Sequence, residues 1–161
     1  MDRQTDNQQP KFSDARLELA WLGGFIDGEG SLMLGNRPDR IIVTPRKCVR
    51  KKFLVPRIAI SGTHEVTFHF IEGLLTNLRL PHHIVWRTWK NPRYKKAWDI
   101  RVQGMKRCAV WLGKIEPYLI TKRGQANLLI EWIISRQESN RLSPYSEREL
   151  EIADEIRRLN H

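Results

Sequence analysis

The stretch FIDGEGS, residues 25–31, contains two carboxylates whose neighbours include residues without side chains. Asp27 and Glu29 alternate there with Gly28 and Gly30. Carboxylates that are held close together need a divalent cation, or one of them must take up a proton. The carbonyl oxygen of Gly28 is accessible enough to serve as a further oxygen ligand. The stretch therefore indicates a metal site, while a glycine-rich helix end with incidental acids is the plainer alternative.

The segment before these acids has the spacing of an α-helix, which would position them. It covers residues 14–27, DARLELAWLGGFID, and either Ser13 or Asp14 can cap its start. Its apolar residues recur at i, i+3 and i+7, namely at Leu19, Leu22 and Ile26.

Small residues form a stripe on this predicted helix. Gly23 and Gly24 each cost a helix about 1 kcal/mol relative to Ala, a cost that is tolerable where two helices pack closely. Ala20, Gly24 and Asp27 lie along one line, with Gly23 beside it. The stripe predicts a pair of helices packed backbone to backbone, with the acids of both helices meeting at their ends.

The remaining elements follow from periodicity and turn chemistry. Strands are expected at 31–35, 53–61, 83–90 and 96–103, and helices at 64–79, 104–116, 122–136 and 146–159. A basic loop follows the first strand, Pro56 favours an edge position or a bulge in the second, and the turn NPRYK joins the last two as a hairpin. Ser146 and Glu149 match a capping box. After a flexible tail at 1–12, the order predicts one α+β domain at 13–161, an antiparallel sheet with helices on one face.

Basic residues are numerous and unevenly placed. The 161 residues include 28 Lys+Arg and 18 Asp+Glu, so the net charge is +10, which favours a polyanionic partner such as nucleic acid. Eight bases and one acid lie from Arg37 to Arg57, and nine bases and one acid lie from Arg79 to Arg107. The expected strands and their loops therefore carry the positive charge, whereas the last expected helix is much more acidic.

Cysteine usage and hydropathy exclude other classes of protein. Cys48 and Cys108 are too few for a disulfide framework or a metal cluster, so we expect free thiols in a reducing, intracellular compartment. No apolar run approaches the roughly 20 residues of a membrane span, and the polar N-terminus lacks the apolar core of a secretion signal. We expect no membrane partner.

Alternation along the strands gives the predicted sheet one polar and one apolar face. The alternation sets Arg57, Ala59, Ser61, Val85, Arg87, Trp89, Asp99, Arg101 and Gln103 opposite Ile58, Ile60, Ile84, Trp86, Thr88, Trp98, Ile100 and Val102. Arg, Asp, Gln and Ser can hydrogen-bond to base edges, and a sheet can enter a major groove. The polar face therefore indicates a DNA-contacting surface, with an ordinary solvated face as the alternative.

Two segments resemble the LAGLIDADG homing endonuclease family. Residues 19–31, LAWLGGFIDGEGS, are similar to the family's motif in its FIDGEGS form, and residues 116–130, EPYLITKRGQANLLI, resemble a later stretch. The helix–strand–strand–helix–strand–strand order is also similar, so the resemblance covers roughly residues 14–136. It implies the αββαββα fold with a saddle-shaped sheet. Because the chain holds one copy of the motif, it also implies a homodimer.

The resemblance implies a site-specific endonuclease that hydrolyses both strands of a long, pseudo-palindromic DNA target, as in intron homing. Glu29 then binds the catalytic metals and Gly28 lends its carbonyl, with Mg²⁺ as the cofactor, Mn²⁺ as a substitute, and Ca²⁺ bound without cleavage. Lys122 matches the basic residue near the scissile phosphate, and Asp27 supports the site or caps the helix pair. The resemblance further implies a dimer interface at Ala20, Gly23, Gly24 and Asp27.

A polar residue near the end of the second strand is expected to hold the water network of such a site. Ser61 and Thr63 are the catalytic candidates, and His64 is a further one. The pair His82–His83 lacks a carboxylate or Cys at ligand spacing, so we predict no metal there. Trp89 is the tryptophan most suited to stacking on a base.

The expected contacts with double-stranded DNA come from the basic loops and the polar face. They are Arg37, Arg40, Arg46, Lys47, Arg50, Lys51, Arg57, Ser61, Arg87, Trp89, Lys90, Arg93, Lys95, Lys96, Asp99, Arg101 and Gln103. The main rival is a non-cleaving binder on the same fold, either an RNA-splicing maturase that binds intron RNA or a transcription regulator. An unrelated basic α+β domain is a second rival, but it gives no reason for the glycine–acid helix end. The resemblance places the protein in an organelle or in a microbial cytoplasm.

Overall fold

The computed structural model describes residues 14–44, 47–88, 90–91, 93, 95–139 and 143–160, with side chains described outside residues 37–52. The elements are α1 (Ala15–Glu29), β1 (Gly30–Thr44), β2 (Lys47–Gly62), α2 (Glu65–Asn77), β3 (His83–Arg87), β4 (Ala97–Gln103), α3 (Met105–Ile115), a 3-10 turn η1 (Glu116–Tyr118), α4 (Arg123–Glu138) and α5 (Glu147–Leu159). This order confirms the predicted α+β class.

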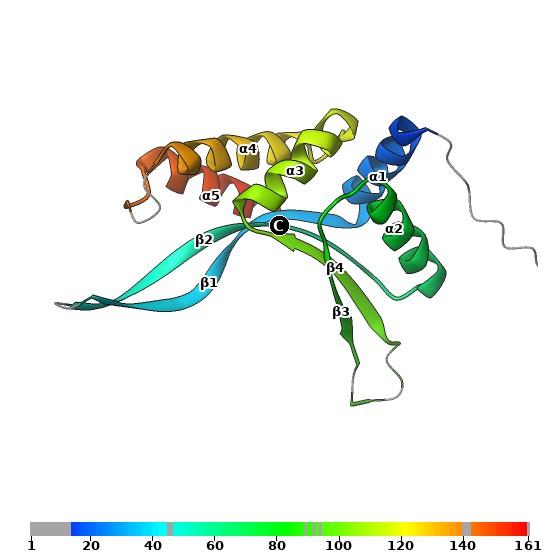
Figure 1. Ribbon diagram of the computed structural model, residues 1–161, viewed down its shortest axis with the longest axis horizontal. Coiled ribbons are helices and arrows are strands. Elements are labelled where there is room, and N and C mark those ends of the chain that lie inside the picture. The colour runs from blue at the N-terminus through cyan, green and yellow to red at the C-terminus, as the bar shows by residue number, and fades with distance from the viewer. Residues whose placement is uncertain are drawn as a thin grey trace, which may run out of the picture.

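The strands form one antiparallel sheet in the order β1-β2-β4-β3. The sheet is strongly curved, and the helices lie over one of its faces (Figure 1). The β1–β2 hairpin and the β3–β4 pair descend on either side of the opposite, concave face, which gives the predicted saddle shape.

The strand register confirms the predicted polar and apolar faces. Arg57, Ala59 and Ser61 of β2 pair with Gln103, Arg101 and Asp99 of β4, and Asp99 also pairs with Val85 of β3. The alternate residues face the helices and are buried, as Ile58, Ile60, Ile100 and Val102 show. We call the side of the sheet that carries Arg57, Ser61, Arg87, Asp99, Arg101 and Gln103 the polar face.

The predicted basic loop between the first two strands is wrong. The first strand continues to Thr44, and the second already begins at Lys47, so the two pair as a long hairpin with a register shift between Arg37 and Arg40. The pattern of alternating apolar residues does not predict the long strands, because most of the hairpin extends beyond the four-stranded part of the sheet. Backbone pairing between the two strands, rather than a buried face, defines the strands there.

Two smaller predictions need adjustment. The third strand ends at Arg87 rather than at residue 90. Pro56 lies in an inner strand, but β4 pairs with β2 only from Arg57 onward. Pro56 therefore stands at a locally free edge, where a missing N–H leaves no gap in the ladder.

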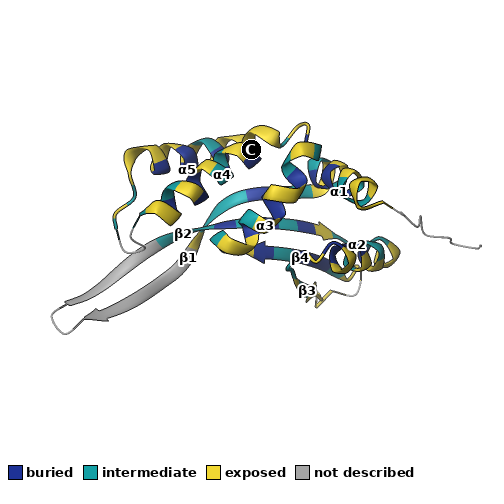
Figure 2. Ribbon diagram, turned by 45° about the horizontal axis from the view of Figure 1, so that its top comes forward, coloured by how far each residue is buried: buried dark blue, intermediate teal, exposed yellow. Residues whose placement is uncertain are grey.

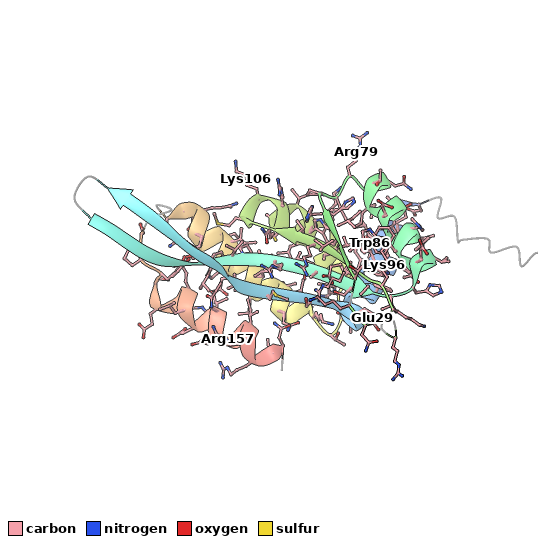
Figure 3. The ribbon with its side chains drawn as sticks, turned by 90° about the horizontal axis from the view of Figure 1, so that it is seen from below. Glu29, Arg79, Trp86, Lys96, Lys106 and Arg157 are labelled. Atoms are coloured by element: carbon pink, nitrogen blue, oxygen red, sulfur yellow. The ribbon has the colours of Figure 1, made fainter. Side chains whose placement is uncertain are left out.

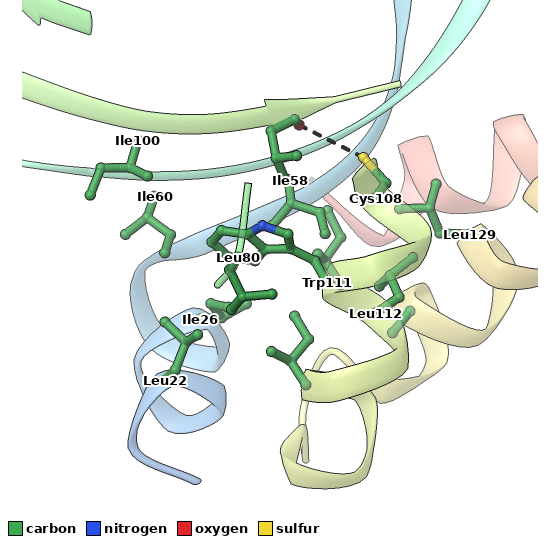
Figure 4. Packing of buried hydrophobic residues seen from close by; sticks show 14 of the residues in the cluster. Leu22, Ile26, Ile58, Ile60, Leu80, Ile100, Cys108, Trp111, Leu112 and Leu129 are labelled. Atoms are coloured by element: carbon green, nitrogen blue, oxygen red, sulfur yellow. Dashed lines mark hydrogen bonds between the residues drawn. The ribbon is translucent and has the colours of Figure 1, made fainter. Parts of the chain in front are cut away.

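The core lies between the helices and the sheet, where the buried residues gather (Figure 2). Figure 4 shows Leu22 and Ile26 of α1 packed near Trp111 and Leu112 of α3, against the strand residue Ile58. Trp98, Trp111 and Trp132 are buried in this core. Among the described helices, none is both long and apolar enough to cross a membrane.

Two predicted helix starts are confirmed. Oδ1 of Asp14 accepts the N–H of Arg16 at 2.8 Å, which caps α1. Ser146 and Glu149 form the predicted capping box at the start of α5, with hydrogen bonds in both directions.

Candidate active site and nucleic-acid interface

The motif acids lie where α1 passes directly into β1. Glu29 is the last residue of the helix and is exposed, as is Gly28. Figure 3, which views the sheet from the polar face, shows Glu29 at this junction. A Cβ at Gly30 would lie 2.8 Å from the carbonyl oxygen of Ile26, so glycine permits the abrupt change from helix to strand. The junction thus offers one free carboxylate on the polar side of the sheet.

Asp27 is turned the other way and ties α1 to the segment before α4. Its Oδ2 accepts the N–H of Ile120 at 2.6 Å, and its Oδ1 accepts the N–H of Lys122 at 2.9 Å and the hydroxyl of Thr121 at 3.0 Å. Lys122, the N-cap residue of α4, makes no capping hydrogen bond with its own side chain in the described structure. Asp27 therefore supplies the carboxylate that the start of α4 requires.

These hydrogen bonds keep Asp27 ionised. Burial raises the pKa of its carboxyl, but the hydrogen bonds from Ile120, Lys122 and Thr121 outweigh burial and hold the pKa below its usual value. Its acceptor positions are filled within the chain, so Asp27 positions the site rather than offering a free ligand.

Lys122 also reaches the end of α1 with its side chain. Its Nζ donates a hydrogen bond to the carbonyl oxygen of Asp27, two residues before Glu29. The structure therefore brings together the predicted metal-binding acid and the predicted basic residue, which lie 93 positions apart in the sequence. The sequence does not single out Thr121, whose hydroxyl joins the same network. Its place just before a helix start is the only signal for it.

The small-residue stripe of α1 divides between two environments. Ala20 and Gly24 are exposed, and a Cβ at Gly24 would meet nothing within 4 Å. Gly23 is buried, and a Cβ there would lie 2.8 Å from Cβ of Tyr118 in η1. Gly23 is therefore required for packing within the chain, which is a different role from the predicted dimer contact. Ala20 and Gly24 leave one face of the helix open.

A second cluster of charges is centred on Asp99, in the middle of the polar face. Ser61 donates its hydroxyl to Oδ1 at 2.5 Å. Nε of Arg87 and a terminal nitrogen of Arg101 each donate to Oδ2 at 2.5 Å. Asp99 is 2% exposed, whereas Arg87 and Arg101 are 45% and 32% exposed. One buried carboxylate thus holds two guanidinium groups at the surface of the sheet.

The expectation that Asp99 contacts DNA directly is corrected by this arrangement. Its carboxylate is buried and both oxygens are engaged, so it orients Arg87 and Arg101 instead of meeting a base. Burial raises the pKa of Asp99, but the hydrogen bonds from Ser61 and Arg87 and the charge of Arg101 outweigh it and lower the pKa. The two arginines retain donors that can meet base edges or phosphates.

The candidates for a water network lie in different settings. The hydroxyl of Ser61 is engaged by Asp99, while Thr63 is exposed between β2 and α2. His64 is the N-cap of α2, where Nδ1 accepts the N–H of Thr67 at 3.4 Å. His64 therefore has a local structural role, and Thr63 is the candidate with a freely accessible position.

The other predicted DNA contacts are on the surface or outside the described side chains. Arg57 is half-buried, and its Nε has no hydrogen-bond partner among the described residues. The exposed residues include Lys90, Arg93, Lys95, Lys96 and Gln103. The side chains of Arg37, Arg40, Arg46, Lys47, Arg50 and Lys51, and Trp89 altogether, lie outside the part that the structure describes.

The donor chemistry at the α1–β1 junction fits a hard divalent cation. Glu29 provides a carboxylate and Gly28 a carbonyl oxygen, and Mg²⁺ is commonly held by one or two carboxylates with substrate phosphates and water. Across the described ranges, no three His, Cys, Asp or Glu side chains converge as a metal site. At the His82–His83 pair, Nδ1 of His82 lies 2.8 Å from the carbonyl oxygen of Leu80.

Comparison with solved structures identifies the fold. The chain is similar to the homing endonuclease I-CvuI in complex with its target, with a TM-score of 0.66 and 23% identity over 90% of this chain and 83% of that one. It is likewise similar to the archaeal intron-encoded homing endonuclease I-Vdi141I complexed with DNA, with a TM-score of 0.67 and 16% identity over 92% and 87% of the two chains.

A third similar structure carries the family's name. It is the LAGLIDADG homing endonuclease I-GzeII in complex with a DNA target, with a TM-score of 0.56 and 19% identity over 88% of this chain but 43% of that one. This chain has the LAGLIDADG homing endonuclease fold. The resemblance seen in the motif is thereby confirmed at the level of the fold.

Comparison of the sequence alone finds no relative, in contrast to comparison of the structure. No protein-family model matches the chain, and no curated protein sequence matches it.

Proposed function

We propose that the protein is a homodimeric, divalent-metal-dependent DNA endonuclease that makes double-strand breaks at a long, pseudo-palindromic target. One observation carries this proposal: the exposed carboxylate of Glu29 lies at the polar side of a basic saddle-shaped sheet, with Lys122 held at the same helix end. The hydrogen bond from Lys122 also caps the end of α1, so the exposed acid of Glu29 is the stronger part of this observation.

DNA is the substrate that the charge and shape favour. The concave side of the sheet carries Arg87 and Arg101, which Asp99 holds in place, and exposed lysines follow in the β3–β4 connection. Prearranged guanidinium groups on a sheet suit base edges in a major groove. The similar structures of I-CvuI and I-Vdi141I are complexes with DNA, and this supports the same partner here.

A second copy of the chain is needed to complete the catalytic site. Of the two motif carboxylates Asp27 is engaged within the chain, so Glu29 is the one left for a metal, and hydrolysis of two strands requires two such positions. Ala20 and Gly24 leave an open face on α1 where a second α1 can approach closely. The match to I-GzeII covers less than half of that protein. The rest of I-GzeII is long enough for a second unit of similar size, which is consistent with two such units acting together.

Glu29 and the Gly28 carbonyl are the residues that would hold Mg²⁺, together with the same groups of the second copy. A bound divalent cation supplies an activated water and stabilises the leaving 3′ oxygen. Lys122 places a positive charge beside the scissile phosphate, and Asp27 fixes the backbone around that lysine. Structures of I-CvuI with DNA were obtained in the presence of Ca and, with the DNA not cleaved, in the presence of Mg. They support the use of a divalent cation, and the choice of Mg²⁺ rests on the oxygen ligands.

Selection and cleavage of DNA from a randomised duplex library tests the proposal. The full chain is incubated with the library and Mg²⁺, with EDTA in a parallel reaction, and the new DNA ends are sequenced. We expect discrete double-strand cuts, related by two-fold symmetry, that require the metal. Binding of a defined sequence without cleavage would replace this proposal with a regulator or a maturase, and intron RNA would then be the next ligand to test.

A further inference from the structure

The turn before α5 makes one long-range contact with the sheet. The hydroxyl oxygen of Tyr145 accepts the backbone N–H of Leu54 in β2 at 2.7 Å, across 91 residues of sequence. At this point β2 pairs with Asn36 of β1 on one side, whereas β4 pairs with β2 only from Arg57 onward. Tyr145 thus takes the place of a neighbouring strand for one N–H group of β2.

This contact lies at the place where the hairpin leaves the four-stranded sheet. We call residues 32–36 of β1 and 54–58 of β2 the hairpin root. Beyond the root, β1 and β2 pair only with each other as far as Thr44 and Lys47. A two-stranded ribbon has little stability or fixed direction of its own. Contacts at the root must therefore set the direction of the hairpin.

Tyr145 is itself held firmly by α4. The guanidinium carbon of Arg136 lies 4.8 Å from the centre of the Tyr145 ring. Arg136 also donates to the carbonyl oxygens of Ser143 and Pro144, at 3.3 Å and 3.5 Å, on the two residues before the tyrosine. One arginine of α4 therefore fixes both the ring and the backbone that leads to it.

A buried acid holds that arginine in turn. Glu149 of α5 lies 3.4 Å from Arg136, and both side chains are almost fully buried. The other oxygen of Glu149 accepts the hydroxyl of Ser135 at 2.8 Å. A buried ion pair satisfied in this way tolerates few alternative arrangements, so Tyr145 is presented to β2 in one position.

The opposite edge of the root is held by the end of α5. Nδ2 of Asn160 donates to the carbonyl oxygen of Leu32 in β1 at 2.9 Å. The start of α3 adds a third contact, since the N–H of Gly104 donates to the carbonyl oxygen of Pro56 at 3.0 Å. The root is therefore fixed from both of its edges, and Tyr145 makes the contact farthest out along β2.

We propose that Tyr145 is a positioning residue for DNA recognition, which sets the direction of the β1–β2 hairpin and so determines which outer base pairs of the target it meets. This inference rests on the proposed DNA-binding function. The sequence places seven lysines and arginines between residues 37 and 52, beyond the root. Figure 1 shows the hairpin extending away from α1, the helix on which the proposed second copy docks. Outer base pairs, rather than those at the centre of the target, therefore depend on this contact.

Hydrogen exchange in the free protein tests the contact itself. Tyr145→Phe removes the acceptor oxygen and keeps the ring against Arg136. We expect the Leu54 amide to exchange roughly tenfold faster in this variant, the factor that corresponds to loss of one hydrogen bond, while amides of β4 are unchanged. Leu150→Ala, at an exposed position of α5, is the matched control and should leave Leu54 unaffected. Unchanged exchange at Leu54 in Tyr145→Phe would overturn the proposal.

Selection from a randomised duplex library tests the consequence for recognition. We expect Tyr145→Phe to lose base preference at the outer positions of the selected target and to keep it at the central ones. The urea midpoint of unfolding should fall only slightly, by the amount that one lost hydrogen bond allows. An equal loss at all positions would overturn the positioning role. If the wild-type chain selects no sequence at all, the proposed function fails and this role with it, while the exchange rates still show whether the contact exists.

Discussion

The backbone N–H of Lys122 donates a hydrogen bond of 2.9 Å to Oδ1 of Asp27, 95 residues earlier in the chain. The side chain of the same lysine donates to the carbonyl oxygen of the same aspartate. Together these two bonds join the end of α1 to the start of α4 and bring the lysine amine beside the motif that ends in Glu29. The first acid of the motif therefore holds α1 against the start of α4, and the second, Glu29, is the exposed acid of the proposed site.

Asp27→Ala should destabilise the protein and impair the site. The N–H groups of Ile120 and Lys122 lose their acceptor, as at a helix that loses its N-cap, so we expect the free energy of unfolding to fall by about 1–2 kcal/mol. Asp27→Asn keeps an acceptor oxygen, so its free energy of unfolding should fall by less. Urea unfolding of both variants measures this, and equal stability of Asp27→Ala and wild type would contradict the capping role.

Asp99→Asn should weaken both the fold and base discrimination. Loss of the charge that holds two arginines is expected to cost about 1–3 kcal/mol of unfolding free energy at neutral pH and a similar amount of discrimination at one or two base pairs. Urea unfolding and competition binding with single-base variants of the selected target measure the two effects. Asp154→Asn, in an exposed pair with Arg157, is the matched control.

The difference in stability between wild type and Asp99→Asn should change with pH in a definite direction. The folded protein lowers the pKa of Asp99 below its usual 3.8. The stability that this carboxylate contributes is therefore fully present above pH 3.8 and is lost as the pH falls through the folded pKa. The difference in stability between wild type and Asp99→Asn should shrink over that range. A difference that is constant from pH 6 down to pH 2 would show that the Asp99 charge has no part in it.

The two adjacent glycines of α1 should respond oppositely to alanine. Gly24→Ala adds a methyl group in open space and should stabilise the monomer by up to about 1 kcal/mol through helix propensity. Gly23→Ala forces a contact with Tyr118 and should destabilise it. Gly24→Leu should leave the fold intact but separate the two copies, which sedimentation measures. A stable dimer of Gly24→Leu would place the dimer contact elsewhere.

Glu29→Gln should separate binding from cleavage. The amide keeps the shape of the side chain and removes the charge that a divalent cation requires. We expect DNA affinity to stay within about threefold of wild type and the single-turnover cleavage rate to fall by about a hundredfold or more. Glu18→Gln, in the same helix but outside the motif, is the control. Normal cutting by Glu29→Gln would remove Glu29 from the site.

Cys108 should be inert in the folded protein. It is fully buried below β2, its Sγ lies 3.3 Å from the carbonyl oxygen of Pro56, and burial raises the pKa of its thiol to about 12 from 9.0. In a Cys48→Ser background, native protein at pH 8 should contain about a thousandfold less thiolate than a free thiol. A chromogenic disulfide reagent should then react only as the chain unfolds. Rapid labelling of native protein would contradict this packing.

Local sequence signals determine a large part of this molecule. The apolar spacing before FIDGEGS predicts α1, alternation predicts the two faces of β2 and β4, and Ser146 with Glu149 predicts the start of α5. The reason is that each of these features depends on residues within a few positions of one another. The motif also singles out Glu29 as the candidate metal ligand through its resemblance to FIDGEGS, while Gly30 serves the change from helix to strand.

The tertiary structure alone decides which side chains are free to act. Asp27 and Asp99 look like Glu29 in the sequence, but the folded chain engages both. Asp27 is engaged by residues 93 to 95 positions away, and Asp99 by Arg101 of its own strand and by Arg87 and Ser61, 12 and 38 positions away. The long β1–β2 hairpin escapes prediction for a related reason, since its strands are defined by pairing and not by a buried face. Hydrogen bonds between distant segments form only when the core brings them together, and no local pattern of residues records which partners will meet.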